Sequence, residues 1–289
     1  MKIVLSMLIG MAIPFFLASG SVQAAEPVAM VTDLTGNAWL LKEGKQERLN
    51  VLSYLNQGGR VRLDSKASIS ITAFNPAAVY SISGPAKLEL VSGEVHVISG
   101  SSLERSSLDQ QKANAGRQFS AIQRERLAMA AVRMRGFGLR LMAPVNGELL
   151  NVHPTFTWAA PNEAKSFVVT ITDESEEVVV SEATVIEPTW QLPTNLSLQH
   201  GHRYSWEVRI LTTSGKEVAD SGEFAIIDEE RSRQILKQKP SVNASFSDRV
   251  LYALLLESEG LEIDAADEWK LLAEERPNEQ LLEVHLQKH

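Results

Sequence analysis

The stretch from Met142 to Ile227 constrains the fold most strongly, because its large apolar residues alternate with polar ones. In the run 204–210, Tyr204, Trp206 and every second residue after them are large and apolar, and serine, glutamate and arginine lie between them. Successive side chains of a strand point to opposite faces, so such a run has one buried face and one wet face. Turn-forming clusters separate about seven short runs of this kind, which predicts an antiparallel β-sandwich over residues 141–228.

A short segment inside this stretch refines the prediction. Residues 198–204 read Leu-Gln-His-Gly-His-Arg-Tyr, which resembles the corner before the penultimate strand of fibronectin type III domains. The resemblance implies that Gly201 forms the turn and that the hydroxyl of Tyr204 bonds back to the corner backbone. His200 stands where the family has proline, and Trp158 stands where such domains keep a core tryptophan. Sandwiches of this kind serve many functions, so the resemblance implies a fold.

The start of the chain predicts export. Lys2 precedes the apolar run 3–17, and a small-x-small cleavage site at Val22 and Ala24 follows it. This is the pattern of a secretory signal peptide, which we predict over residues 1–24 with cleavage after Ala24. The alternative is an uncleaved anchor, but the run is shorter than the ~20 residues that a spanning helix needs. We therefore expect a periplasmic protein with no membrane span after signal cleavage.

Composition narrows the class of protein further. The chain has 289 residues, 44% of them hydrophobic, which is enough for two or three globular domains. There is no cysteine, so the chain is no lipoprotein and its domains must be held by core packing. The net charge of −8 argues against a general nucleic-acid partner.

Residues 25–102 predict a second β domain. Apolar runs of about four to six residues recur roughly every 8–12 positions between glycine turns, as in a small β roll or barrel. Their order resembles the FecR domain of bacterial periplasmic proteins, and the matching residues are Leu55, Gly58, Val61, Ala67, Ile69, Ile71, Gly84 and Pro85. In membrane-spanning members of that family, this domain senses a partner outside the membrane. The resemblance implies an extracytoplasmic β module here, without the sigma-factor control that needs a cytoplasmic segment.

Residues 103–140 predict a helical connector with a basic side. Phe119 and later apolar residues recur at helical spacing, and five arginines crowd the remaining positions. These candidate interaction residues are Arg117, Arg124, Arg126, Arg133 and Arg135. One interpretation is a cationic surface for an anionic envelope polymer such as peptidoglycan. The other is a linker helix whose arginine stems lie along apolar surface.

Residues 229–289 predict a helical tail. Small residues, a loop glycine, an aromatic residue and a proline follow each other at the offsets of one 34-residue tetratricopeptide repeat. The residues that carry this resemblance are Ala253, Gly260, Ala265, Trp269 and Pro277. A single repeat cannot bury its apolar face by itself. We expect the tail from Phe246 to Leu286 to pack against the sandwich, with Trp269 in the core, and a partner protein is the alternative cover.

The sequence contains no recognised catalytic motif. The closest histidine pair is His200 and His202, which has no carboxylate beside it in sequence, so we predict neither a metal site nor a cofactor. Trp39 and Trp190 could stack on sugars, although tryptophans of β domains usually lie in cores. The fold class predicted is multidomain and mainly β with α. The function predicted is a non-enzymatic periplasmic interaction, scaffold or sensor protein with unidentified envelope-protein partners, and the alternative is binding of an envelope glycan.

Overall fold

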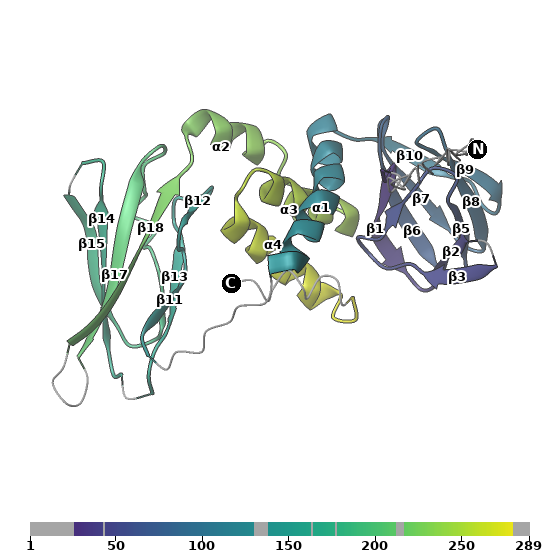
Figure 1. The fold of residues 1–289 in the computed structure, drawn as a ribbon. Helices are drawn as coiled ribbons and strands as arrows, with labels where there is room; N and C mark the ends of the chain where they lie inside the picture. Colours follow the sequence, from purple (N-terminus) through teal and green to yellow (C-terminus); the bar gives the residue numbers. More distant parts are fainter. Residues whose placement is uncertain are drawn as a thin grey trace, which may run out of the picture.

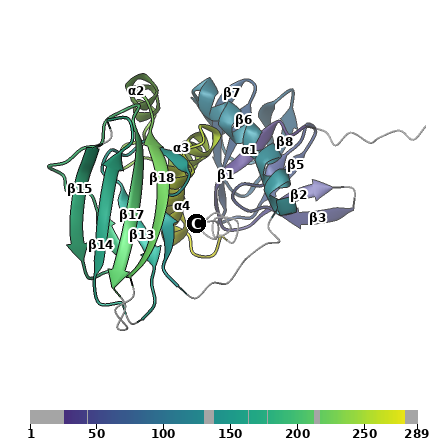
Figure 2. The same cartoon turned by 60° about the vertical axis from the view of Figure 1, so that its left-hand side comes forward.

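The computed structural model describes residues 26–42, 44–129, 138–162, 164–176, 178–211 and 217–279. These residues form two β domains with a layer of helices between them (Figures 1 and 2). The multidomain, mainly β class with added helices is therefore confirmed. The predicted signal peptide, residues 1–24, lies outside the described residues. No helix in the described part of the chain is both long and apolar enough to cross a membrane.

The N-terminal β domain consists of two five-stranded antiparallel sheets, in the orders β10-β7-β6-β1-β4 and β3-β2-β5-β8-β9. Its strands alternate as predicted, and in β7 the buried residues are Ala78, Tyr80 and Ile82. A Cβ atom on Gly84 would lie 2.0 Å from the carbonyl oxygen of Asp64, so this turn requires glycine. The strands are β1 (Ala29–Thr35), β2 (Ala38–Lys42), β3 (Lys45–Arg48), β4 (Tyr54–Leu55), β5 (Arg60–Leu63), β6 (Ser68–Phe74), β7 (Ala77–Ser83), β8 (Ala86–Val91), β9 (Glu94–Ser99) and β10 (Glu104–Ser107).

The N-terminal domain extends beyond residue 102. Strand β10 pairs with β7 through residues that the sequence assigned to the helical connector 103–140, so the helix begins later, at Gln110. Polar residues dominate β10, and an edge strand of this composition carries little sequence signal. A small β domain is present as expected, and its FecR identity stays a prediction.

The four described helices lie between the two β domains, where α1 contacts β1 and β6, α3 contacts β1, and α4 contacts β12 (Gly147–Leu149) (Figure 1). Two of them have side-chain caps: Asp228 accepts from the backbone N–H of Arg231, and Ser245 accepts from that of Asp248. Gly260 has a φ of +78° and forms the turn between the last two helices. The predicted helical hairpin is thus present, and its tetratricopeptide identity stays a prediction. The helices are α1 (Gln110–Met129), α2 (Glu229–Leu236), α3 (Phe246–Ser258) and α4 (Glu262–Glu275).

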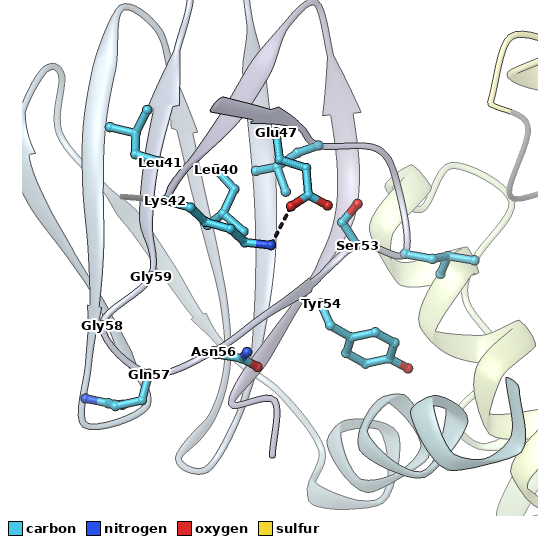
Figure 3. Close-up of a pocket in the computed structure, with 12 residues that line it drawn as sticks. Leu40, Leu41, Lys42, Glu47, Ser53, Tyr54, Asn56, Gln57, Gly58 and Gly59 are labelled. Carbon is cyan, nitrogen blue, oxygen red and sulfur yellow. Dashed lines mark hydrogen bonds and ion pairs between the residues drawn. The ribbon is translucent and has the colours of Figure 1, made fainter. Parts of the chain in front are cut away.

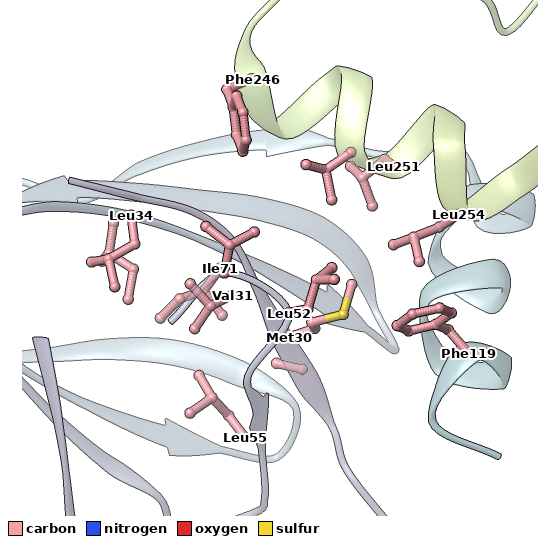
Figure 4. Packing of buried hydrophobic residues seen from close by; sticks show 14 of the residues in the cluster. Met30, Val31, Leu34, Leu52, Leu55, Ile71, Phe119, Phe246, Leu251 and Leu254 are labelled. Carbon is pink, nitrogen blue, oxygen red and sulfur yellow. The ribbon is translucent and has the colours of Figure 1, made fainter. Parts of the chain in front are cut away.

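The expectation that the tail packs against the sandwich is wrong for most of its apolar surface. Helix α3 is buried nearly all round, and its residues share one hydrophobic core with the N-terminal β domain and α1 (Figure 4). Members of this shared core include Met30, Ile71, Phe119, Leu254 and Trp269. The physical reason is that the two sandwich sheets already cover each other's apolar faces, whereas β1 and β6 leave an apolar face for the helices. Of the tail's described residues, Ile263 packs against the sandwich core.

The sandwich consists of a three-stranded sheet, β11-β13-β16, facing a five-stranded sheet, β12-β18-β17-β14-β15. With β12 running parallel to β18 and the other pairs antiparallel, this is an immunoglobulin- or fibronectin III-like sandwich. Trp158, Tyr204 and Trp206 lie in its core, as predicted. Its strands are β11 (Arg140–Ala143), β12 (Gly147–Leu149), β13 (Thr155–Ala159), β14 (Phe167–Asp173), β15 (Val178–Val185), β16 (Thr189–Gln191), β17 (Arg203–Leu211) and β18 (Glu217–Ile226).

The corner before β17 has the predicted geometry. The backbone N–H of Gln199 donates to the hydroxyl oxygen of Tyr204 over 2.7 Å, and Gly201 has a φ of +79°. The indole N–H of Trp206 donates to the carbonyl oxygen of Pro144 over 2.7 Å, which satisfies a buried donor. These bonds tie the first half of β17 to the corner before it and to the segment between β11 and β12.

Candidate functional site

The predicted cationic surface is only partly described. Arg117 lies on α1 with its side chain exposed, while the neighbouring residues Ala115 and Phe119 face the shared core. Arg124 and Arg126 belong to α1, but their side chains lie outside the described part, as do Arg133 and Arg135 altogether. Whether these arginines form one surface therefore stays a prediction.

Trp269, the tryptophan of the helical tail, contacts residues of two other helices. Trp269 on α4 is 1% exposed, and its ring centroid lies 6.5 Å from that of Phe119 on α1. Its indole N–H donates to Oε1 of the buried Glu257 on α3 over 3.2 Å. Trp269 thus joins three helices, which is a core role.

The histidine pair has a carboxylate neighbour that the sequence spacing did not reveal. Nδ1 of His202 lies 2.8 Å from Oδ2 of Asp173, which comes from the end of β14. Burial alone would raise the pKa of Asp173, but hydrogen bonds from His202 and from the N–H groups of Ser175 and Glu176 outweigh it and hold that pKa below its usual range. His200 contacts the carbonyl oxygen of Ile227 instead. The hydrogen bonds of Asp173 with His202, Ser175 and Glu176 therefore fix the turn that follows β14.

Within the described ranges, no cluster of three or more His, Cys, Asp or Glu residues is placed to hold a metal ion. The two tryptophans considered for sugar stacking are each partly covered. Trp39 donates to Asp64 over 3.4 Å and has the Arg62 guanidinium 5.9 Å from its ring centroid, while Trp190 packs on Phe156 at 5.6 Å.

A shallow pocket of about 470 Å³ opens on the N-terminal domain beside β2 and β4 (Figure 3). An exposed ion pair, Lys42 with Glu47, spans 2.5 Å at its rim. Tyr54 turns away toward the helices and donates to the carbonyl oxygen of Gly116 over 3.0 Å. None of the described residues that line the pocket is both charged and buried, and the exposed pair at its rim contributes little binding energy.

The junction between the sandwich and the helices contains polar contacts beside the packing of Ile263. Both carboxylate oxygens of Asp264 on α4 accept backbone N–H groups after β12, from Leu150 over 2.8 Å and from Asn151 over 3.2 Å. Burial raises the pKa of Asp264 to about 6, although these bonds act in the opposite direction. Arg231 on α2 lies 2.6 Å from a carboxylate oxygen of Glu148 on β12. The sandwich is therefore attached to the helices at one end by hydrogen bonds and an ion pair, together with the packing of Ile263.

The opposite side of the sandwich has a sheet edge that none of the other described strands covers. Strand β15 ends its five-stranded sheet and pairs with β14. Val179 at its start is 63% exposed and Ile186 just after it is 76% exposed. An edge strand presents unpaired backbone N–H and C=O groups, which can bind a further strand. The predicted interaction residues did not include this edge, although the valine-rich run 178–180 was visible in the sequence.

No protein-family model matches the sequence, and no curated protein matches it. Among solved structures, CopC from Methylosinus trichosporium OB3b is 18% identical, with 32% of this chain and 95% of that chain covered and a TM-score of 0.24. An Fn3-like protein from Clostridium thermocellum is 18% identical, with 31% and 88% covered and a TM-score of 0.23. Similarity this weak carries no argument about function, and the sandwich assignment rests on its strand order and core.

Proposed function

We propose that this protein is a non-enzymatic interaction protein of the bacterial periplasm, which pairs with an envelope protein along the open edge of its sandwich. The observation that carries the proposal is β15, an eight-residue edge strand with exposed apolar residues. Extended segments of partner proteins add to such edges through backbone hydrogen bonds, and side chains flanking the edge give specificity.

The edge has few of the features that protect edge strands from pairing. Natural proteins commonly place lysine or proline on such strands, and the sequence of β15, Val-Val-Val-Ser-Glu-Ala-Thr-Val, has neither. The register shift between β14 and β15 lies near Val179, and from Ser181 to Val185 the two strands pair without interruption. This leaves a regular stretch on which another strand can pair.

The rest of the structure supports a scaffold role. The N-terminal β domain and the helices share one core, so they form a single body. Asp264 and Arg231 attach the sandwich to that body through three hydrogen-bonded or charged contacts at β12 and the residues after it. The two β domains are therefore joined through the helices, with β15 on the side facing away from them (Figure 1).

The proposal can be tested by photo-crosslinking in intact cells. A photoreactive amino acid replaces Val179, and in a matched control it replaces Val242, which is 99% exposed on the loop between α2 and α3. We expect a discrete protein adduct from position 179 that is absent from position 242. A competitor chain that carries Val179→Lys and no photoreactive group should fail to suppress formation of that adduct, because lysine disfavours strand addition. No adduct at 179, or the same adduct at both positions, would contradict the proposal.

Glycan binding remains the second candidate, because one surface of the N-terminal domain favours it. A shallow groove of about 320 Å³ on β6, β7 and β10 is lined largely by serine hydroxyls, with Glu104 at its side. Hydroxyl groups can both donate to and accept from sugar hydroxyls. Co-sedimentation with purified peptidoglycan tests this candidate, and binding should weaken in Ser81→Val, which removes one hydroxyl from the groove. Binding that Ser81→Val leaves unchanged would argue against the groove as the site.

A further inference from the structure

We propose that the junction between the sandwich and the helices is a pocket for the basic side chain of a partner protein, a lysine or an arginine. The pocket has a volume of about 420 Å³ and lies where the segment after β12 meets α2, α3 and α4. It is separate from the β15 edge. The inference rests on the proposed interaction function, because it names a chemical feature that a protein partner must present.

One wall of the pocket is acidic. Asp264, Asp267 and Glu268 on α4 line it, and Lys239 is the single basic residue among its described lining residues. Asp264 is held in place by the backbone N–H groups of Leu150 and Asn151, and a carboxylate oxygen can accept more than one hydrogen bond. Burial raises the pKa of Asp264 and of Glu268, which means that their negative charges are poorly solvated. A bound cation would relieve this cost.

Tyr252, which is one of the residues that line the pocket, has a buried hydroxyl for which the described residues provide no hydrogen-bond partner. Tyr252 lies on α3 and is 1% exposed. Burial raises the pKa of Tyr252, and the negative charges of Glu268 and Asp264, which line the same pocket, add to that rise. Buried polar groups normally have partners, because an unsatisfied one is costly. An ammonium or guanidinium N–H that donates to the phenol oxygen would satisfy that oxygen as an acceptor.

The remaining walls are apolar. Leu150 and Val152 contribute from the sandwich side, and Leu236 and Leu256 contribute from α2 and α3. A lysine or arginine side chain has an alkyl stem that packs on such residues and a charged head that reaches polar groups. A bare metal ion would leave these walls without a contact, and the described lining residues form no metal-holding cluster. The shape and charge together favour a cation on an alkyl stem.

The first test is an NMR titration of the full-length, ¹⁵N-labelled protein with Nα-acetyl-lysine N-methylamide. We expect saturable shifts of the backbone amides of Leu150 and Asn151, which lie against Asp264. The norleucine analogue, which has the stem without the charge, is the matched control and should not cause them. Shifts that are absent, or equal for both probes, would overturn the proposal. Pentylamine binding more tightly than the lysine probe would also overturn it, because a free amine and not a side chain would then be the preferred ligand.

Four variants locate the binding. Tyr252→Phe and Glu268→Gln should each weaken binding of the lysine probe by about fivefold or more, since each removes a polar contact to the cation. Lys239→Met should strengthen binding about twofold or more, because it removes the competing positive charge. Glu274→Gln, on an exposed part of the same helix, should leave the affinity unchanged. Equal effects of Glu268→Gln and Glu274→Gln would contradict a defined pocket.

Binding of the lysine probe and crosslinking at β15 test the two proposals independently. A Val179 adduct without lysine-probe binding would disprove the pocket and leave the proposed function standing. Lysine-probe binding without any Val179 adduct would disprove pairing along the β15 edge and leave the pocket as the site of contact.

Discussion

Ser247 on α3 donates its hydroxyl to Oγ1 of Thr32 on β1 over 2.7 Å, in a contact that is buried on both sides. Oγ1 of Thr32 is also hydrogen-bonded to the hydroxyl of Thr72 on β6 over 3.0 Å. The three hydroxyls form a short chain inside an otherwise apolar interface, and residues 215 positions apart meet there. Buried hydroxyls need fixed partners, so this chain sets where α3 lies on the sheet.

Removing the Ser247 hydroxyl, which donates to Thr32, should weaken the attachment of α3 to the sheet. Ser247→Ala is expected to lower the free energy of unfolding by about 1–2 kcal/mol, because Thr32 loses one buried hydrogen bond but keeps another. Chemical denaturation measures the change. Ser258→Ala is the matched control on the same helix, since Ser258 donates to the carbonyl oxygen of Leu255 within the helix. The prediction is wrong if the two alanine variants lose the same stability.

A second prediction concerns the core that the helical tail shares with the N-terminal β domain. Trp269→Ala should cost about 3–5 kcal/mol as a large core deletion. Because Trp269 packs against Phe119 in the shared core, amide hydrogen exchange should accelerate in β1 and β6. Exchange in β17 should stay unchanged. Acceleration confined to the sandwich would show that the tail belongs with the sandwich after all.

The sequence predicted local structure better than the assembly of the domains. Alternation and turn residues suffice for the sandwich, because one buried face imposes a period of two on each strand. The same patterns say that Val250 and Leu254 must be covered, but they do not say by which surface. Which surface covers α3 depends on two apolar faces that come together only in the folded protein. Ser247 and Thr32, which form a buried hydrogen bond at this interface, cannot be told from surface hydroxyl residues in the sequence.

The candidate site shows the same limit. Arginines 117–135 stood out because charge is visible in a sequence, whereas Tyr252 reads as one more core aromatic. Its importance comes from Asp264 and Glu268 on the following helix and from a hydroxyl that finds no partner in the described residues. The contact of His202 with Asp173 was likewise hidden, because strand pairing brings residues 29 positions apart together.

The tyrosine corner provides a third prediction. Tyr204→Phe removes the acceptor for the Gln199 N–H and should lower the free energy of unfolding by about 1–3 kcal/mol. Tyr252→Phe is the matched control, because its hydroxyl has no described partner to lose, and it should change stability by less than about 0.5 kcal/mol or raise it. Thermal or chemical denaturation of both variants decides the comparison. Equal losses would mean that the corner bond contributes nothing specific.

The last prediction concerns the pH dependence of stability at the junction. Burial raises the pKa of Asp264 to about 6 in the folded protein, from an ordinary value of 3.8. A raised folded-state pKa means that the folded protein binds its proton more tightly, so the stabilising contribution is complete below about pH 4 and is lost as the pH rises through 6. The full effect of such a shift is at most about 3 kcal/mol.

Asp264→Asn tests this, because asparagine stays neutral at every pH. The free energy of unfolding of the wild-type protein minus that of the variant should be larger at pH 4.5 than at pH 7.5, as measured by chemical denaturation at both values.

The groups facing Asp264 include Asp267 and Glu268 on α4, Tyr252 on α3 and Lys239 after α2, while the sandwich contributes backbone N–H groups. Burial also raises the pKa of Glu268, which acts in the same direction, so the comparison is repeated in a Glu268→Gln background. Asp173 has a lowered pKa and acts in the opposite direction, but it is present in every variant and cancels. A stability difference that does not change with pH would mean that Asp264 is charged in the folded protein throughout this range and that the junction carries no proton-linked strain.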